Sequence, residues 1–215
     1  MEIEDTYLTI DKPSEGLYKE KMSKFFSFAE PCRTVEEAME IVNLYRKEYY
    51  DARHVCWAYM IGPDRLTFRS NDDGEPSGTA GKPILGQINS FNLTNLCVIV
   101  IRYFGGIKLG TSGLIEAYRT AAAEALSAAE IQEKILEEEL TVHFEYPLMG
   151  EAMRIVKEEN ATVVKQDFYD DCLLTVSLRK AAMPKMRARF EGVYGIDIVE
   201  KKEETLISPE MQEEE

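Results

Sequence analysis

The chain has 215 residues and a mass of 24.5 kDa, with 45% hydrophobic and 10% aromatic residues, 13 glycines and 8 prolines. This composition excludes a collagen-like or wholly disordered chain and is sufficient for one large or two small folded domains. The 25 basic and 39 acidic side chains give a net charge of −14, which excludes a protein that coats nucleic acid through an overall basic surface but leaves room for a local basic patch.

The first half of the chain predicts an antiparallel sheet with amphipathic helices packed on it. Strands are expected at 5–10, 17–21, 25–29, 55–61 and 66–71, and helices at 35–50, which a capping box opens, and at about 77–87. The run 97–101 is apolar on both faces and predicts a central strand buried between two layers. Thr111 or Ser112 is expected to cap the next helix, which ends near Glu130 and carries a stripe of small residues.

The second half changes to the order strand, helix, strand, strand, helix, strand. The expected ranges are 137–146, 147–159, 162–169, 172–178, 183–190 and 196–200. This order is typical of the ferredoxin-like split βαβ unit. We therefore expect an α+β protein with an N-terminal domain at 1–132, a ferredoxin-like domain at 133–201, and a disordered acidic tail at 202–215.

Cysteine spacing and the N-terminus indicate where the protein resides. Cys32, Cys56, Cys97 and Cys172 are widely separated and form no C-x-x-C pair, which predicts buried, reduced thiols. The first residues lack the features of a signal peptide, and no apolar run approaches the roughly 18 residues of a membrane span. We expect a cytoplasmic protein with no membrane partner.

One long segment lacks acidic residues. Between Pro76 and Leu114 there is no Asp or Glu, and eight of the 13 glycines lie within 74–113. The segment also contains Lys82, Arg102 and Lys108. Glycines allow backbone N–H groups to approach an anion, and missing carboxylates avoid repulsion, so the segment predicts an anion-contacting surface. Arg102 and Lys108 are the first candidates for direct contact.

The second part of this segment is a strand followed by a glycine loop and the start of a helix, an order that is typical of a phosphate cradle. The candidate ligand-binding residues of this loop are Gly105, Gly106, Gly110, Thr111 and Ser112. Gly105 and Gly110 have the spacing of a Walker A loop, but Thr111 replaces its lysine, and no G-x-G-x-x-G is present. The alternative is that the glycines serve only tight turns and close packing. Tyr103 and Phe104 are candidates for stacking on a base, and the alternative for Phe104 is that it only anchors the loop in the core.

Three segments carry a family resemblance. Residues 73–83 (DGEPSGTAGKP), 102–110 (RYFGGIKLG) and 54–59 (HVCWAY) closely resemble the YigZ/IMPACT family. The resemblance extends over essentially the whole chain. It implies an N-terminal domain with the left-handed βαβ superfold of a ribosomal-protein domain, and a C-terminal ferredoxin-like domain similar to one in elongation factor G. Eukaryotic relatives regulate translation initiation by competing for the activator of an amino-acid-starvation kinase, whereas the bacterial two-domain members have no settled activity.

Catalytic and metal-binding interpretations remain open for several of the motif residues. For hydrolysis, the candidates are Ser77, Thr79 or Ser112 as nucleophile, His54 as base, and Asp73 or Glu75 as the residue that orients it, but no G-x-S-x-G is present. Asp73 and Glu75 suit either a Mg²⁺ pair or a turn whose carboxylate caps a helix, and we favour the turn. His54 and Cys56 could begin a zinc site, but a hydrogen bond from His54 to the 73–75 loop, with Cys56 in the core, is favoured. We expect no metal and no cofactor.

These observations favour a non-enzymatic regulator of translation whose N-terminal surface binds RNA or a protein of the translation machinery, with no DNA specificity. One alternative is a small phosphoester- or nucleotide-binding enzyme that uses the 105–113 loop. Another is a pure protein-interaction module that docks through the motif surface.

Overall fold

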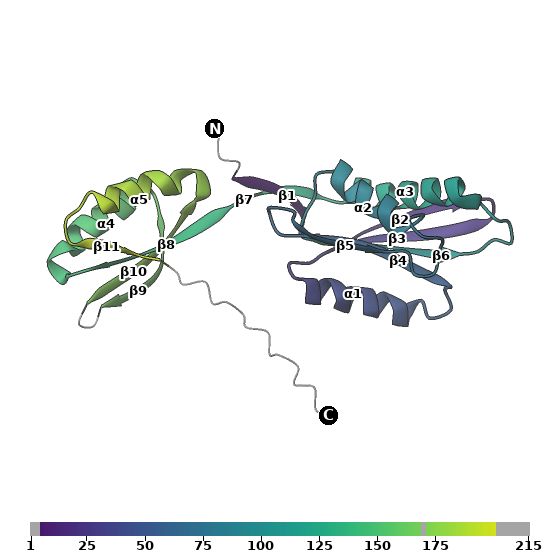
Figure 1. Ribbon diagram of the computed structural model, residues 1–215, viewed down its shortest axis with the longest axis horizontal. Coiled ribbons are helices and arrows are strands. Elements are labelled where there is room, and N and C mark those ends of the chain that lie inside the picture. The colour runs from purple at the N-terminus through teal and green to yellow at the C-terminus, as the bar shows by residue number, and fades with distance from the viewer. Residues whose placement is uncertain (1–4, 169–170, 201–215) are drawn as a thin grey trace, which may run out of the picture. The chain divides into compact units, whose positions relative to one another are not determined.

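The structure is a computed structural model that describes residues 5–168 and 171–200, and the acidic tail predicted at 202–215 lies outside them. The chain divides into two compact units (Figure 1). The first is Thr6–Ile135, and the second runs from Leu136 onward and includes Asp5. Both units combine helices with antiparallel sheets, so the protein belongs to the α+β class.

A five-stranded antiparallel sheet forms the centre of the first unit, in the order β2-β3-β6-β4-β5. Its strands are β2 (Ser14–Glu20), β3 (Ser23–Pro31), β4 (His54–Ile61), β5 (Thr67–Asn71) and β6 (Leu96–Tyr103). All residues of β6 except Tyr103 are buried, and the strand pairs with β3 on one side and β4 on the other. The prediction of a central strand at 97–101 is therefore confirmed.

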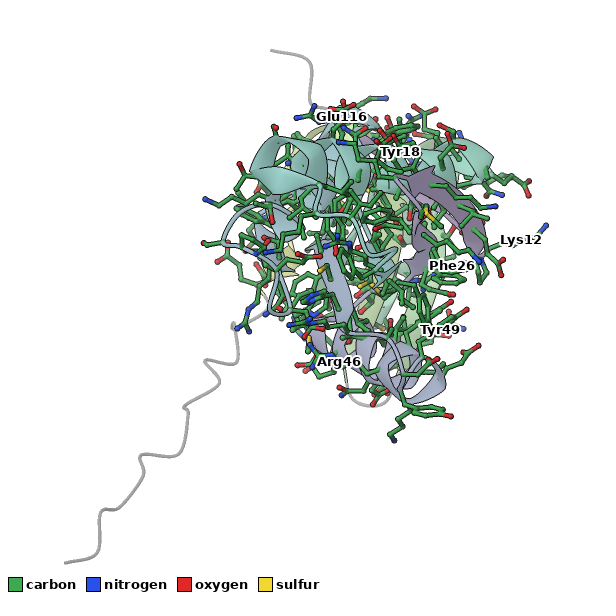
Figure 2. The ribbon with its side chains drawn as sticks, turned by 90° about the vertical axis from the view of Figure 1, so that its right-hand side faces the viewer. Lys12, Tyr18, Phe26, Arg46, Tyr49 and Glu116 are labelled. Atoms are coloured by element: carbon green, nitrogen blue, oxygen red, sulfur yellow. The ribbon has the colours of Figure 1, made fainter. Side chains whose placement is uncertain are left out.

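Helices cover both faces of this sheet (Figure 1). They are α1 (Val35–Glu48) on one face, and α2 (Gly81–Ser90) and α3 (Gly110–Ala128) on the other. Figure 2 shows the same layers from the side, with Arg46 of α1 and Glu116 of α3 at opposite ends of the view. Each face has its own apolar core, one around Val42 and Ile99 and the other around Ile84 and Tyr118. The stripe of small residues predicted in α3 is buried in the second of these cores.

Helices α2 and α3 both begin at positions that differ from the prediction. Helix α2 begins at Gly81 instead of near Ser77, because residues 77–80 form turns and Gly78 has a φ of +77°. Helix α3 begins at Gly110, and neither Thr111 nor Ser112 caps it. Leu109 occupies the N-cap position, so Thr111 already lies inside the first turn of the helix and its hydroxyl cannot act from the N-cap position. The first N–H groups of α3 are therefore left without a capping side chain.

A two-stranded ribbon joins the two ends of the first unit. Strand β1 (Thr6–Ile10) pairs with β7 (Ile131–Ile135), from Thr6 opposite Ile135 to Ile10 opposite Ile131. We did not predict β7, because its sequence IQEKI is short and has two charged residues among its five, and both of its isoleucines are exposed. Its pairing places residues 133–135 in the first unit, whereas the predicted domain boundary followed residue 132.

The second unit has the predicted split βαβ order. Its sheet runs β11-β8-β10-β9, and helices α4 and α5 pack on one face over a separate apolar core. The elements are β8 (Glu137–Phe144), α4 (Met149–Glu158), β9 (Thr162–Phe168), β10 (Cys172–Arg179), α5 (Met183–Glu191) and β11 (Ile196–Val199). Pro147 lies in a short 3-10 turn, η1 (Tyr146–Leu148), which precedes α4, so the helix begins two residues later than predicted. The arrangement is the ferredoxin-like one.

The cysteines and the helices bear on two further predictions. All four cysteine side chains are buried, as predicted, and none is in a disulfide. Burial raises the pKa of Cys56 and of Cys97, so neither is an activated thiolate. Within 5–168 and 171–200, none of the helices combines the length and the apolar character needed to span a bilayer.

Candidate functional site

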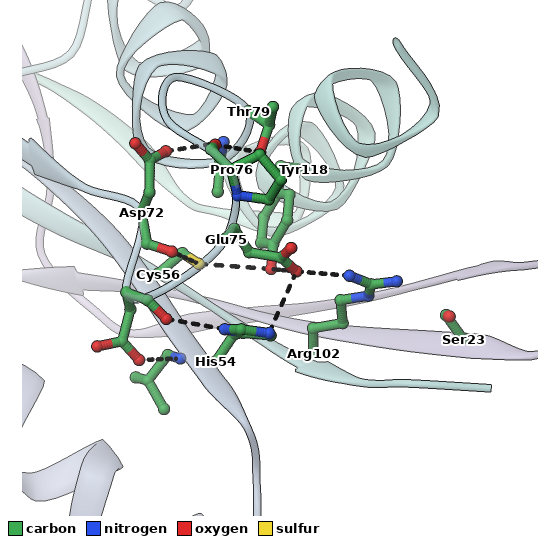
Figure 3. A network of polar contacts seen from close by, with 12 residues as sticks. Ser23, His54, Cys56, Asp72, Glu75, Pro76, Thr79, Arg102 and Tyr118 are labelled. Atoms are coloured by element: carbon green, nitrogen blue, oxygen red, sulfur yellow. Dashed lines mark hydrogen bonds and ion pairs between the residues drawn. The ribbon is translucent and has the colours of Figure 1, made fainter. Parts of the chain in front are cut away.

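The three motif segments meet at one end of the central sheet. His54 begins β4 and lies directly opposite Arg102 near the end of β6, because the two strands are neighbours in the sheet. The loop that contains Glu75 passes beside this pair (Figure 3). The first residues of α3 line the same region. Sheet topology thus places His54 opposite Arg102, although 48 positions separate them in the sequence (102 − 54 = 48).

A buried ion pair is the centre of this region. Arg102 Nη1 donates to Glu75 Oε1 at 2.6 Å, and only 8% of the Arg102 side chain and 3% of the Glu75 side chain are exposed. The guanidinium lies over the rings of Phe25 and Phe104, with its central carbon 5.6 and 5.4 Å from their centroids. These contacts hold the guanidinium in one orientation. Arg102 is therefore a buried, partnered residue and not the surface cation that the sequence suggested.

Tyr118 of α3 completes the environment of Glu75. Its hydroxyl donates to Glu75 Oε1 at 2.9 Å, and Cys56 Sγ lies 3.4 Å from the same hydroxyl. Burial raises the pKa of Tyr118 far above its usual range, and the negative charge of Glu75 adds to this effect. The phenol therefore stays protonated and acts as a donor to the carboxylate. We missed Tyr118 as a site residue because in the sequence it belongs to the buried stripe of α3.

His54 hydrogen-bonds the loop, as predicted. Its Nδ1 lies 2.8 Å from the carbonyl oxygen of Asp73, and because a carbonyl only accepts, Nδ1 carries the proton. In the neutral ring this leaves Nε2 without a proton, 3.9 Å from Glu75 Oε1 and beyond hydrogen-bond distance. Cys56 is fully buried and donates to the Asp72 carbonyl at 3.0 Å. The interpretation of Cys56 as a core residue is thus confirmed.

A carboxylate does stabilise the start of α2, but it belongs to Asp72 and not to Asp73 or Glu75. Asp72 accepts from the backbone N–H groups of Gly78, Ala80 and Gly81 at 2.7 to 3.0 Å. Burial alone would raise the pKa of Asp72, but the three backbone hydrogen bonds outweigh it and the pKa is lowered from 3.8.

Asp73 holds the loop against neighbouring elements. Its carboxylate accepts from the Val55 N–H at 2.7 Å and pairs with Arg46 of α1 at 2.6 Å. Since Glu75 is held by Arg102 and Tyr118, both carboxylates of the proposed Mg²⁺ pair already have internal partners. Both carboxylates therefore stabilise the fold of this loop, and neither is free to bind Mg²⁺.

A cavity of about 370 Å³ opens beside the ion pair, and we call it the Arg102 pocket. Three cationic side chains line it, Arg53, Arg102 and Lys108, against the one carboxylate of Glu75. Counted over its arginine, lysine and glutamate side chains, the lining carries a surplus of two positive charges in a chain whose net charge is −14. This surplus favours an anionic ligand.

The rest of the lining is apolar side chains and backbone. The apolar residues are Pro76, Phe104, Leu109 and Leu114, and the half-exposed Phe104 ring is accessible from solvent. Gly110 and Thr111, the first residues of α3, also line the pocket. A pocket with apolar walls and a few polar groups that converge is the usual form of a small-ligand site.

The remaining candidate residues lie outside this lining. They are Lys82, Ser77, Thr79, Gly105, Gly106, Ser112 and Tyr103. Thr79 is buried and donates to the Pro76 carbonyl, and the Tyr103 hydroxyl donates to Asp51. A Cβ at Gly105 would lie 2.1 Å from the Met22 carbonyl carbon, so this glycine permits close packing of two loops, as the alternative interpretation holds. Arg53 was missed because it precedes the acid-free segment.

Comparisons with known proteins agree with the motifs. A family model described as the Impact N-terminal domain matches residues 21–126. The IMPACT family member YvyE of Bacillus subtilis (strain 168) is 35% identical over 153 residues, which are 71% of this chain and 70% of that protein. The IMPACT family member YigZ of Escherichia coli (strain K12) is 34% identical over 171 residues, 79% of this chain and 84% of that protein. This chain belongs to the IMPACT family.

The residues of the Arg102 pocket can be compared with the extent of the family match. A crystal structure described as that of a hypothetical protein is 30% identical and has a TM-score of 0.70, covering 94% of this chain and 100% of that chain. Every residue that lines the Arg102 pocket lies within the 21–126 match to the family domain. The candidate site is therefore formed by the part of the chain that the family model describes.

Proposed function

We propose that this protein regulates translation by binding, and that the Arg102 pocket of its first unit holds an anionic group of RNA or of another component of the translation machinery. Membership of the IMPACT family supports the regulatory role, because the resemblance to this family implies a part in the regulation of translation. The observation that supports the anionic ligand is the surplus of two positive charges around the pocket.

The local charge explains how an acidic protein would bind a polyanion. Arg53 and Lys108 are exposed at the pocket, and neither forms an ion pair within the described part of the chain. Cations that lack a carboxylate partner are free to replace the counterions of a phosphate. Binding would therefore be local and sensitive to salt.

The enzyme alternative has less support from the geometry. Ser77 and Ser112 are exposed and line no part of the pocket, and Asp73 and Glu75 are engaged by Arg46 and Arg102. A nucleophile next to His54 would be required for hydrolysis, and among the described residues no hydroxyl group hydrogen-bonds this histidine. We therefore favour binding over turnover.

Salt-dependent binding of a labelled single-stranded RNA tests this proposal by fluorescence anisotropy. The informative variant is Arg53→Ala/Lys108→Ala, because both side chains are exposed and their removal leaves the Glu75–Arg102 pair intact. We expect weaker binding and a salt slope reduced by about one unit per cation removed. Lys47→Ala/Lys157→Ala, which removes the same charge from exposed positions outside the pocket lining, is the matched control.

The control defines the contradicting result. If both double variants bind equally well with equal salt slopes, RNA does not contact the Arg102 pocket. If the wild-type protein binds no RNA at low salt, the RNA form of the proposal is wrong and a protein partner takes its place.

A further inference from the structure

Arg102 has one buried hydrogen-bond donor that the protein does not satisfy. Its Nη1 donates to Glu75, but its Nε is buried and has no partner among the described residues. A buried, unpaired N–H on a charged group costs free energy, and native proteins retain such groups where a ligand or water completes them. Since Arg102 lines the pocket, a ligand inside the pocket is placed to supply the missing acceptor.

A second set of donors, which no side chain caps, lies at the start of α3. This 19-residue helix has no capping side chain and no acidic residue in its first turn, and its first two residues line the pocket. Free N–H groups and the positive end of the helix dipole both favour an anion. Lys108 precedes this turn and adds a third kind of donor. The donors therefore converge from a side chain, a helix end and a loop.

Burial decides which kind of phosphate can reach these donors. The Arg102 side chain is only 8% exposed, so an oxygen that accepts from its Nε must enter the pocket. A phosphodiester within an RNA strand carries a sugar on each side and a single negative charge. A phosphate monoester ends the molecule, enters with its oxygens first, and carries up to two negative charges that match the surplus of two.

The geometry points to a phosphate monoester on a small apolar or aromatic body, with a nucleoside monophosphate as the type case, as the ligand of the Arg102 pocket. This inference rests on the proposed function and names the ligand class of the same site. The phosphate lies at the first turn of α3 with Lys108 and Arg102, and the body of the ligand lies against Phe104, Leu109 and Leu114. A volume of about 370 Å³ is within the usual range for a small-ligand site.

The same chemistry has two sources, a free mononucleotide and the 5′-phosphorylated end of an RNA. Isothermal titration calorimetry of the full chain with adenosine 5′-monophosphate, adenosine and inorganic phosphate tests the class. Anisotropy with one short RNA, prepared with a 5′-phosphate or a 5′-hydroxyl, separates the sources. We expect saturable binding of the monophosphate and none of adenosine.

Two variants test the site without removing the buried pair. Thr111→Asp places a carboxylate in the first turn of α3, where it favours the helix and repels a phosphate, so the protein should stay folded and lose at least about tenfold in affinity. Asn43→Asp adds the same charge on an exposed position of α1, across the sheet, and should change affinity by less than about twofold because surface charges are screened. Lys108→Ala should weaken binding, and Lys82→Ala, which removes an exposed lysine outside the pocket, should not.

The outcomes separate this inference from the proposed function. The inference is wrong if the monophosphate does not bind the wild-type protein, or if it binds the Thr111→Asp variant as tightly as it binds the wild-type protein. If RNA nevertheless binds with no preference for a 5′-phosphate and responds to Arg53→Ala/Lys108→Ala, the proposed function stands alone. If the monophosphate binds and RNA with either end does not, the ligand class is supported and RNA binding is refuted. If neither RNA nor the monophosphate binds, the inference and the RNA form of the proposed function are both wrong.

Discussion

Glu75 lines the Arg102 pocket and neutralises a cation that has little access to water. It accepts from Arg102 and from Tyr118, and its own side chain is 3% exposed. Removing one partner of a buried ion pair leaves the other charge uncompensated in a medium of low polarity. The pair therefore matters for stability mainly because the loss of one partner would leave the other as an unpaired buried charge.

Glu75→Gln keeps the size of the side chain and removes its charge. We expect the free energy of unfolding to fall by about 3 kcal/mol, because Arg102 remains buried without a counterion. Urea denaturation followed by circular dichroism measures this. Glu116→Gln, which breaks the exposed pair with Arg119, should cost at most about 1 kcal/mol. An equal loss of unfolding free energy in the two variants would show that the buried ion pair stabilises the protein no more than the exposed one.

At the scale of elements, the start of α2 depends on a residue outside the helix. Asp72 follows β5, and its carboxylate accepts hydrogen bonds from three backbone N–H groups in the segment that leads into α2. This contact holds the motif loop against the sheet and keeps Glu75 beside Arg102. The positions of the pocket residues are thus coupled to one carboxylate nine residues before the helix.

Asp72→Asn should lower the free energy of unfolding near neutral pH by about 1–2 kcal/mol, because an amide accepts these hydrogen bonds less strongly than a carboxylate. The pKa of Asp72 is lowered in the folded state, so its contribution is complete above 3.8 and is lost as the pH falls through the folded value. Urea midpoints from pH 7 to pH 3 should therefore converge for the two proteins.

A matched variant separates this effect from a general loss of charge. Asp64→Asn removes a carboxylate that makes a single hydrogen bond in an exposed turn, and should change stability by less than about 0.5 kcal/mol at every pH. A constant difference between wild type and Asp72→Asn down to pH 3 would contradict the assigned hydrogen bonds.

At the scale of the whole molecule, each unit has a core of its own. Two apolar clusters lie within Thr6–Ile135 and a third lies within the described residues of the second unit. The β1–β7 ribbon pairs the two ends of the first unit. The hydrogen bonds between these two strands therefore need no residue outside this unit. We propose that Thr6–Ile135 is an independent folding unit.

A fragment of residues 6–135 should therefore unfold in one cooperative transition and retain the binding properties of the full chain. A fragment of residues 6–130 lacks β7 and leaves β1 without its antiparallel partner strand, although the bridge from Leu8 to Leu93 remains, so it should have a lower denaturation midpoint. Calorimetry of both fragments measures the difference. A fragment of 6–135 that does not fold, or two fragments of equal stability, would contradict this division of the chain.

Several elements were predictable because their signals are local. Thr34 caps α1 through the Glu37 N–H as the capping box predicted, and the apolar run 97–101 lies in the central strand. Strand β7 and the start of α2 were not predictable in this way. The first is stabilised by pairing with a strand more than 120 residues away, and the second by the carboxylate of Asp72.

The sequence by itself determined the family, the order of most strands and helices, and the segment in which the candidate site lies, because periodicity and motifs are properties of neighbouring residues. Only the tertiary structure decided which charges meet. An acid-free segment along the chain is not an acid-free surface, since folding places Glu75 against Arg102 and brings Arg53 to the same pocket. Electrostatic interactions depend on distance and burial in space, and neither follows from separation along the sequence.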